Sequence, residues 1–224
     1  MKLKALILDF GGVISRTLFE THDVTERALS LKPGTLKWRG PFDPLTDELW
    51  QMMQRRDISE RDYWLQRTKE VGALVGEEWT NMETFVQRAR GAEPETIVRP
   101  EAVWAIDEAQ AAGCRLAILS NELDLFYGKQ LRERLPLLEK FDVISDATYT
   151  GILKPEARAY EACLSALDLP AQDCVFVDDQ LKNVEGAEAV GLPTVHFDVT
   201  NPKSSYARAL AALGLSIHEG DHNA

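Results

Sequence analysis

The sequence has few of the residues that mark secreted or membrane proteins. Cysteine occurs three times, at Cys114, Cys163 and Cys174, and no two of these form a C-x-x-C pair. A disulfide framework is therefore not expected, and the thiols are predicted to be free and buried in a reducing compartment. Long apolar runs are also missing, so neither a signal peptide nor a transmembrane helix is expected. These absences favour a cytoplasmic protein.

Positive charge is scarce as well. Lys and Arg total 25 against 36 Asp and Glu, which gives a formal net charge of -11. A nucleic-acid partner is not expected, because the chain shows no basic footprint for a phosphate backbone. A small anionic substrate stays compatible with this charge, since it needs only a local pocket of donors and a cation. Monomer and homodimer both remain open.

Short apolar runs that alternate with helical patterns dominate the rest of the chain. The run at 6–8 and several later runs of similar length predict buried β-strands. Strands that are apolar throughout and alternate with helices are typical of a parallel sheet covered on both faces. The predicted fold is α/β, with a doubly wound, Rossmann-like parallel sheet. The later strands are expected at 114–120, 143–145, 174–177 and 194–197, and the helices at 100–113, 122–135, 156–167, 184–190 and 204–213.

A block without strand patterns interrupts this alternation after the first strand. Residues 17–96 carry apolar side chains at helical spacing, and Ser59 with Asp62 resembles a capping box. We therefore expect a core domain formed by 1–16 and 97–224, with an inserted α-helical cap domain at 17–96. Helices in the cap are expected at 45–56, 59–71 and 77–90.

One pair of residues in this block lies in a predicted loop. Trp38 and Arg39 stand between Gly34 and Gly40, which favour a turn or loop on either side. An indole and a guanidinium would suit the ring face and the charge of a sugar phosphate. Simple packing within the cap explains the pair equally well, and the sequence leaves both interpretations open.

Polar residues follow several predicted strands at their carboxyl ends. Asp9 follows the first strand, Ser120 and Asn121 end the second, and Asp178 and Asp179 follow a later one. Because ligands bind at the carboxyl edge of open α/β sheets, these side chains are expected to converge there. Taken singly, most have a simpler interpretation as caps of turns or helices. Two adjacent acids, however, repel one another unless a cation or hydrogen-bond donors compensate.

Lys154, directly before Pro155, adds an ammonium group to this set. The combination suits phosphoryl transfer. A carboxylate attacks phosphorus, a hard cation held by oxygen ligands neutralises the developing charge, and a hydroxyl, an amide and an ammonium bind the phosphoryl oxygens. A single lysine before a proline is usually solvated, so the indication comes from the combination.

These residues together resemble the haloacid dehalogenase superfamily of hydrolases, and the resemblance covers the whole chain. The helical insertion at 17–96, which follows the segment Asp9–Val13, is similar to that family's helical cap of the first type. The D-F-G-G-V form and the K-P-E-x-x-x-Y run resemble the subgroup with the phosphatase domain of epoxide hydrolases and small sugar-phosphate phosphatases. The signatures are Asp9-Phe10-Gly11-Gly12-Val13, Ser120-Asn121, Lys154-Pro155-Glu156 and Val177-Asp178-Asp179 with Asn183 following.

The resemblance implies a Mg²⁺ site. Asp9 would be the nucleophile that forms an aspartyl-phosphate and would also bind the metal. The carbonyl of Gly11 would be a second ligand, and Asp179 would bind the metal directly. Asp178 would act through water or as the partner that orients the metal.

The resemblance also implies a phosphate site for a small phosphorylated metabolite. Ser120, Asn121 and Lys154 would hold the phosphoryl group, with Gly12 also contacting the substrate. Ser120 and Lys154 would thereby take part in catalysis, and Asn183 would support the acidic loop.

One position departs from the family pattern. Most phosphatases of the family carry a second Asp two residues after the nucleophile, and here that position is Gly11. General acid and base assistance contributes about 10²–10⁴-fold to a rate. Either a cap residue such as Glu20, His22 or Asp23 takes the role of the missing Asp, or water does, or substrates with poor leaving groups react slowly.

Two other readings remain open. A metal-independent 2-haloacid dehalogenase also lacks the second Asp, but it would not need the paired acids Asp178 and Asp179. A phosphate-binding protein without turnover would explain Gly11, but it would not need the retained Asp9 and Lys154. The prediction is therefore a Mg²⁺-dependent phosphatase, with these two as alternatives.

Overall fold

The computed structural model describes residues 4–90, 94–128 and 131–215. The chain divides into two compact units, which are described separately. The core unit comprises Met1–Ser15, Val98–Asn121 and Pro136–Ala224, and the helical unit comprises Arg16–Ile97 and Glu122–Leu135. Residues 122–135, which the sequence analysis places with the core, are thus grouped with the helical unit.

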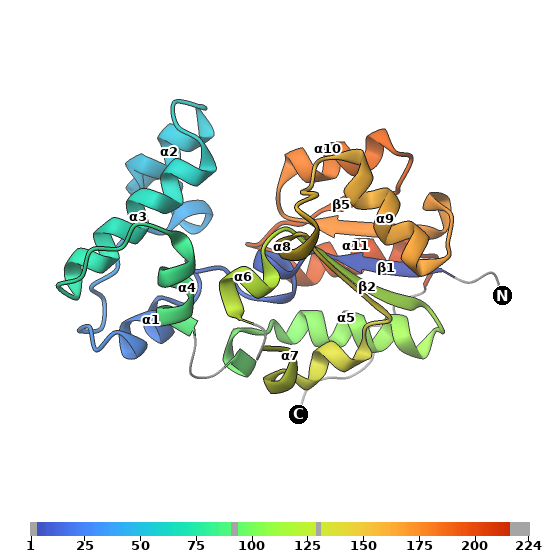
Figure 1. Cartoon of the computed structure of the whole chain (residues 1–224), viewed down its shortest axis with the longest axis horizontal. Helices are drawn as coiled ribbons and strands as arrows, with labels where there is room; N and C mark the ends of the chain where they lie inside the picture. The colour runs from blue at the N-terminus through green and yellow to red at the C-terminus, as the bar shows by residue number, and fades with distance from the viewer. Residues whose placement is uncertain (1–3, 91–93, 129–130, 216–224) are drawn as a thin grey trace. The chain divides into compact units, whose positions relative to one another are not determined.

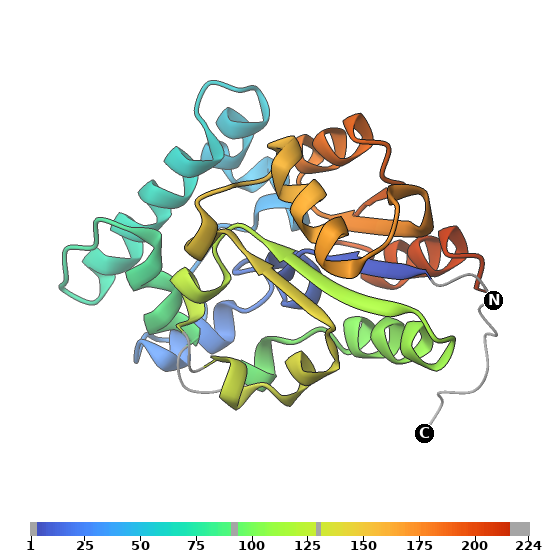
Figure 2. The same ribbon diagram turned by 45° about the vertical axis from the view of Figure 1, so that its right-hand side comes forward.

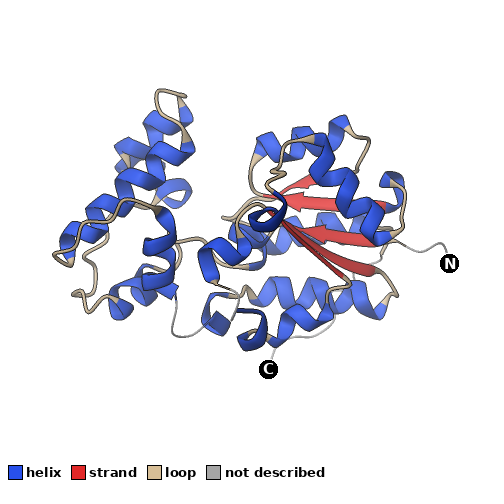
Figure 3. Ribbon diagram, in the orientation of Figure 1, coloured by secondary structure: helices blue, strands red, loops and turns tan. Residues whose placement is uncertain are grey.

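A parallel β-sheet forms the centre of the core unit (Figure 3). Within the described residues it has five strands in the order β3-β2-β1-β4-β5, all parallel to their neighbours. The predicted α/β fold with a doubly wound parallel sheet is therefore confirmed. The strands are β1 (Ala5–Leu8), β2 (Arg115–Ser120), β3 (Val143–Asp146), β4 (Cys174–Asp178) and β5 (Thr194–His196).

Helices cover both faces of this sheet (Figures 1 and 2). Helices α9 (Ala157–Leu167) and α10 (Leu181–Ala189) pack on one face, and α5 (Pro100–Ala111) and α11 (Pro202–Ala212) pack on the other. Every residue of β1 is fully buried, as expected for a central strand covered on both sides. Short elements complete the unit, namely α8 (Ala147–Thr150), the 3₁₀ turns Pro136–Lys140 and Ala171–Asp173, and the turn Phe10–Ile14 after β1.

Local signals in the sequence set several helix ends correctly. Helix α5 has Pro100 in its first turn and ends just before Gly113, whose φ of +77° is the left-handed conformation expected at that position. The predicted thiols are free cysteines, of which Cys163 and Cys174 are buried and Cys114 is partly exposed.

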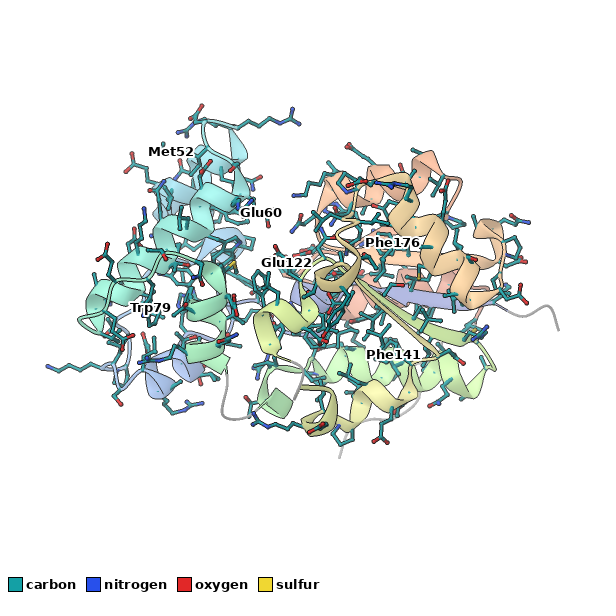
Figure 4. All side chains as sticks on the ribbon, viewed as in Figure 1. Met52, Glu60, Trp79, Glu122, Phe141 and Phe176 are labelled. Carbon is teal, nitrogen blue, oxygen red and sulfur yellow. The ribbon has the colours of Figure 1, made fainter. Side chains whose placement is uncertain are left out.

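The helical unit packs around aromatic side chains. Phe19, Trp38, Tyr63, Trp79 and Phe85 are all buried in one cluster, and Trp79 is labelled in Figure 4. Its described helices are α1 (His22–Ala28), α2 (Glu48–Gln54), α3 (Glu60–Leu74), α4 (Met82–Arg90), α6 (Leu123–Tyr127) and α7 (Leu131–Arg134).

Capping residues fix where these helices begin. Helix α3 has the predicted capping box, in which Ser59 and Asp62 bond each other's backbone N–H. Asp47 caps α2 by accepting from the N–H of Trp50 at 2.9 Å. The same carboxylate accepts from Tyr63 Oη and from Arg67, so it ties α2 to α3.

Three predicted helices of the helical unit have the wrong bounds. The predicted helix 122–135 is interrupted at Gly128, which has a φ of +76° that a helix cannot contain. The predicted helix 45–56 begins later because Asp47 caps it, and the helix expected at 77–90 begins at Met82. Helix α1 has no counterpart among the predicted elements. Trp38 is only 7% exposed and contacts Phe19 edge-on, which favours packing within the unit, one of the two interpretations that the sequence leaves open.

Candidate active site

Asp9 lies at the carboxyl edge of the sheet, directly after the central strand β1. Its N–H donates to the carbonyl of Val177 at 2.9 Å, which continues the pairing of β1 with β4. Ser120 ends β2 and Asp178 ends β4, and these two strands flank β1. The fold therefore brings these three strand-end residues to one edge, as the sequence pattern predicts.

Lys154 provides the positive charge at this edge. Its Nζ donates to Asp9 Oδ1 at 2.8 Å and to Asp178 Oδ2 at 2.6 Å, and the residue is only 4% exposed. Burial favours the neutral amine, but the adjacent carboxylates of Asp178 and Asp9 outweigh it and hold the lysine pKa above its usual value. Lys154 is therefore an ammonium ion at neutral pH.

The same network perturbs the carboxyl group of Asp9. Burial raises the pKa of Asp9 to about 6, against the opposing effect of the Lys154 charge, and Asp178 adds to the increase. An additional cation at this edge would favour the carboxylate form.

Asn121 holds the loop that carries Lys154. Its Oδ1 accepts from the Lys154 N–H at 2.7 Å, and its Nδ2 donates to the Lys154 carbonyl at 3.1 Å. Both ends of the amide are thus bonded to one backbone residue 33 positions away. Asn121 therefore positions Lys154, and its contact with a phosphoryl group stays a prediction.

The acidic pair occupies two different environments. Asp178 is fully buried and accepts from the Gln180 N–H at 2.8 Å and from Asn183 Nδ2 at 3.1 Å, in addition to Lys154. Asp179 is partly exposed. Asn183 itself is held by Tyr160, whose hydroxyl donates to the Asn183 carbonyl at 2.7 Å. Asp178 is therefore fixed by its neighbours.

Asp9, Asp178 and Asp179 form a cluster that fits a hard cation. Each offers a carboxylate oxygen, and these oxygens lie within 4.8 Å of one another. Carboxylate oxygen is the ligand that Mg²⁺ and Ca²⁺ prefer. Gly12 lies against this cluster: its φ is +78°, and a Cβ added there would be 2.5 Å from Asp179 Oδ2. A residue with a side chain at position 12 would therefore displace Asp179.

Two residues that the sequence analysis did not identify anchor the loop after Asp9. Arg99, which is 2% exposed, donates to the Gly12 carbonyl from Nε at 3.1 Å and from Nη2 at 3.0 Å. Tyr206 donates to the Val13 carbonyl at 3.0 Å. Neither anchor has a sequence signal, because each is an isolated polar residue far along the chain.

The cap residues considered as substitutes for the missing acid have local roles in the helical unit. Glu20 accepts from the Thr17 N–H and hydroxyl, both at 2.8 Å. Asp23 pairs with Arg27 on the surface. Burial lowers the pKa of His22 to about 4, so its imidazole is neutral at pH 7.

No helix in the described parts of the chain is both long and apolar enough to span a membrane.

Comparisons with known proteins identify the family. A model of the haloacid dehalogenase-like hydrolases matches residues 3–191. The chain is 27% identical to "Phosphatase MT3486" of Mycobacterium tuberculosis over 96% of both proteins. It is 30% identical to "Sesquiterpene phosphatase astK" of Aspergillus oryzae, over 86% of this chain and 89% of that protein. The structure of L-2-haloacid dehalogenase from Xanthobacter autotrophicus shares the fold, with a TM-score of 0.57 at 19% identity over 87% of this chain and 77% of that one. The chain therefore belongs to the haloacid dehalogenase-like hydrolases.

Proposed function

We propose that this hydrolase is a Mg²⁺-dependent phosphatase of a small phosphorylated metabolite, with Asp9 as its nucleophile. The observation that carries the proposal is the position of Asp9. Its carboxylate accepts from the buried ammonium of Lys154 and belongs to an acidic cluster suited to a cation. The two relatives named as phosphatases support the same reaction class.

In the proposed reaction, an oxygen of Asp9 attacks phosphorus and forms an aspartyl-phosphate, which water then hydrolyses. Lys154 has three N–H donors, of which two bond Asp9 and Asp178, so one is left for a phosphoryl oxygen. Ser120 would donate its hydroxyl from the adjacent strand end. Asn121 would act indirectly, by holding the backbone of Lys154. Gly12 would admit the phosphoryl group beside Asp179, since it has no side chain.

The donor set fits Mg²⁺. Asp9, Asp179 and the carbonyl of Gly11 would supply oxygen ligands, and Asp178 would orient the site through the hydrogen bonds that fix it. When bound, the cation would neutralise charge on the phosphoryl oxygens. The paired acids favour this function over a metal-independent dehalogenase. We also propose that the helical unit is the cap that selects the substrate.

The direct test is hydrolysis of p-nitrophenyl phosphate with Mg²⁺ and with a chelator. We expect Mg²⁺-dependent phosphate release that Asp9→Asn abolishes. Asp168→Asn is the matched control, because Asp168 is an exposed residue with a φ of +51°, a conformation that Asn also adopts readily. Turnover independent of metal, with chloride release from 2-chloropropionate, would instead identify a dehalogenase. Phosphate binding without turnover would identify a binding protein.

A further inference from the structure

Gly11 is a glycine that the backbone does not require. Its φ of -70° and ψ of 122° lie in the extended region that any L-residue adopts. A Cβ added at Gly11 would have Asp9 Oδ2 at 4.0 Å as its nearest neighbour, which is ordinary van der Waals separation. Gly12 differs on both counts, since its φ is positive and a Cβ there would collide with Asp179. Neither strain nor crowding therefore explains why position 11 has no side chain.

Three proton-bearing side chains of the described core unit near Asp9 have hydrogen-bond partners within the protein. Lys154 donates to the carboxylates of Asp9 and Asp178. The hydroxyl of Tyr160 donates to the Asn183 carbonyl, and burial raises the pKa of this tyrosine to about 12. The hydroxyl of Tyr206 donates to the Val13 carbonyl. The hydroxyl protons of both tyrosines are thus held by backbone carbonyls, so neither is placed to protonate a leaving group.

We propose that this site acts on anhydrides of phosphoric acid, namely acyl phosphates and diphosphates, whose leaving group departs as a stable anion without taking a proton from the enzyme. The proposal rests on the phosphatase function and specifies its substrate class. These substrates do not need an acidic side chain at position 11. An alkyl phosphate would need one, because its leaving group must take up a proton as it departs.

The two steps balance without a side-chain acid. In the first, the bond from Asp9 oxygen to phosphorus forms as the bond from phosphorus to the leaving oxygen breaks. The leaving oxygen keeps the electron pair and departs as carboxylate or phosphate. In the second, water oxygen bonds to phosphorus, the Asp9 carboxylate leaves with its electron pair, and the proton of water passes to solvent. An alkyl ester would have to release an alkoxide in the first step.

The test is a series of substrates that differ in the leaving group. The conjugate acid of the leaving group has a pKa of about 4 for acetyl phosphate and about 10 for phenyl phosphate. This pKa is about 6 for an alkyl diphosphate, whose leaving group is a phosphate monoester, and about 16, near that of water, for ethyl phosphate. The value of kcat/KM with Mg²⁺ reports formation of the aspartyl-phosphate. For the wild-type enzyme we expect it to fall steeply along the series, with ethyl phosphate the poorest substrate.

A pair of substitutions at the open position isolates the missing acid. We expect Gly11→Asp to raise kcat/KM for ethyl phosphate relative to acetyl phosphate by about 10²–10⁴-fold, the usual contribution of a general acid. Gly11→Asn has nearly the same size and no ionisable group, so it should leave the steep dependence in place. Circular dichroism establishes that both variants are folded, and the wild-type series stands as a test without them.

The outcomes separate this proposal from the phosphatase function. If the wild-type enzyme hydrolyses ethyl phosphate about as well as acetyl phosphate, a proton donor acts from elsewhere and the substrate class is wrong, while the phosphatase function stands. If Gly11→Asn flattens the series as much as Gly11→Asp does, the missing acid is not the cause and the proposal fails. If none of the four compounds nor p-nitrophenyl phosphate is hydrolysed with Mg²⁺, both proposals are overturned.

Discussion

Replacing Lys154 with Met should destabilise the core unit far more than the loss of an ordinary surface lysine. Nζ of Lys154 lies between Asp9 and Asp178, at 2.8 and 2.6 Å, and the side chains of Lys154 and Asp178 are 2% and 0% exposed. Methionine keeps most of the length and apolar volume of the side chain, so the substitution removes mainly the charge. Two neighbouring carboxylates would then remain without their counter-ion.

The magnitude follows from burial. Removing one partner of a buried ion pair costs about 3–5 kcal/mol, because the other charge stays desolvated. Lys140→Met is the matched control: Lys140 pairs with Asp107 in the same unit, but the two side chains are 35% and 52% exposed. Such an exposed pair contributes about 0–1 kcal/mol. The two variants should therefore differ by at least about 2 kcal/mol.

Urea unfolding without Mg²⁺, followed by far-UV circular dichroism, measures this difference. Addition of Mg²⁺ should restore part of the stability of Lys154→Met, because a cation then faces the same carboxylates. A Lys154→Met variant as stable as Lys140→Met would refute the reasoning, since Lys154 could not then be the counter-ion of a buried acidic pair.

Three further outcomes are expected. Asp47→Asn should destabilise the helical unit by about 3 kcal/mol in tryptophan-detected unfolding, because this carboxylate pairs with buried Arg67 and caps α2. Glu48→Gln on the surface is the control, and an equally small change for both variants would contradict the expectation. Burial lowers the pKa of His22 to about 4. Between about pH 4 and 6.5 the unfolded chain therefore binds more protons than the folded chain, and the free energy of unfolding decreases as the pH falls through that range. At about 1.4 kcal/mol per pKa unit, about 2 kcal/mol of this is lost between pH 7 and 5. The thermal midpoint of His22→Asn should therefore vary less between these two pH values than that of the wild type. Asp179→Asn should reduce the thermal stabilisation by Mg²⁺, which is about 2.7 kcal/mol at a concentration of 100 Kd for an intact site, while Asp168→Asn should leave it unchanged.

Features set by near neighbours in the chain were predictable from the sequence. The strand at β1, the start of α5 at Pro100 and the capping box at Ser59 each depend on residues within a few positions of one another. The gathering of Asp9, Ser120 and Asp178 was also predictable, because parallel strands end at a common edge of the sheet. The apolar pattern at 122–135 predicted a single helix, but the positive φ of Gly128 interrupts it.

The sequence by itself determined the fold class, the edge of the sheet where the site lies and the residue types available there. The tertiary structure alone decided which partner each polar side chain takes. Asn121 bonds the backbone of Lys154 across 33 positions, Arg99 reaches Gly12 across 87 and Tyr206 reaches Val13 across 193. Such pairings arise when buried polar groups must be hydrogen-bonded once packing has removed water, and no local pattern records which distant carbonyl will be within reach.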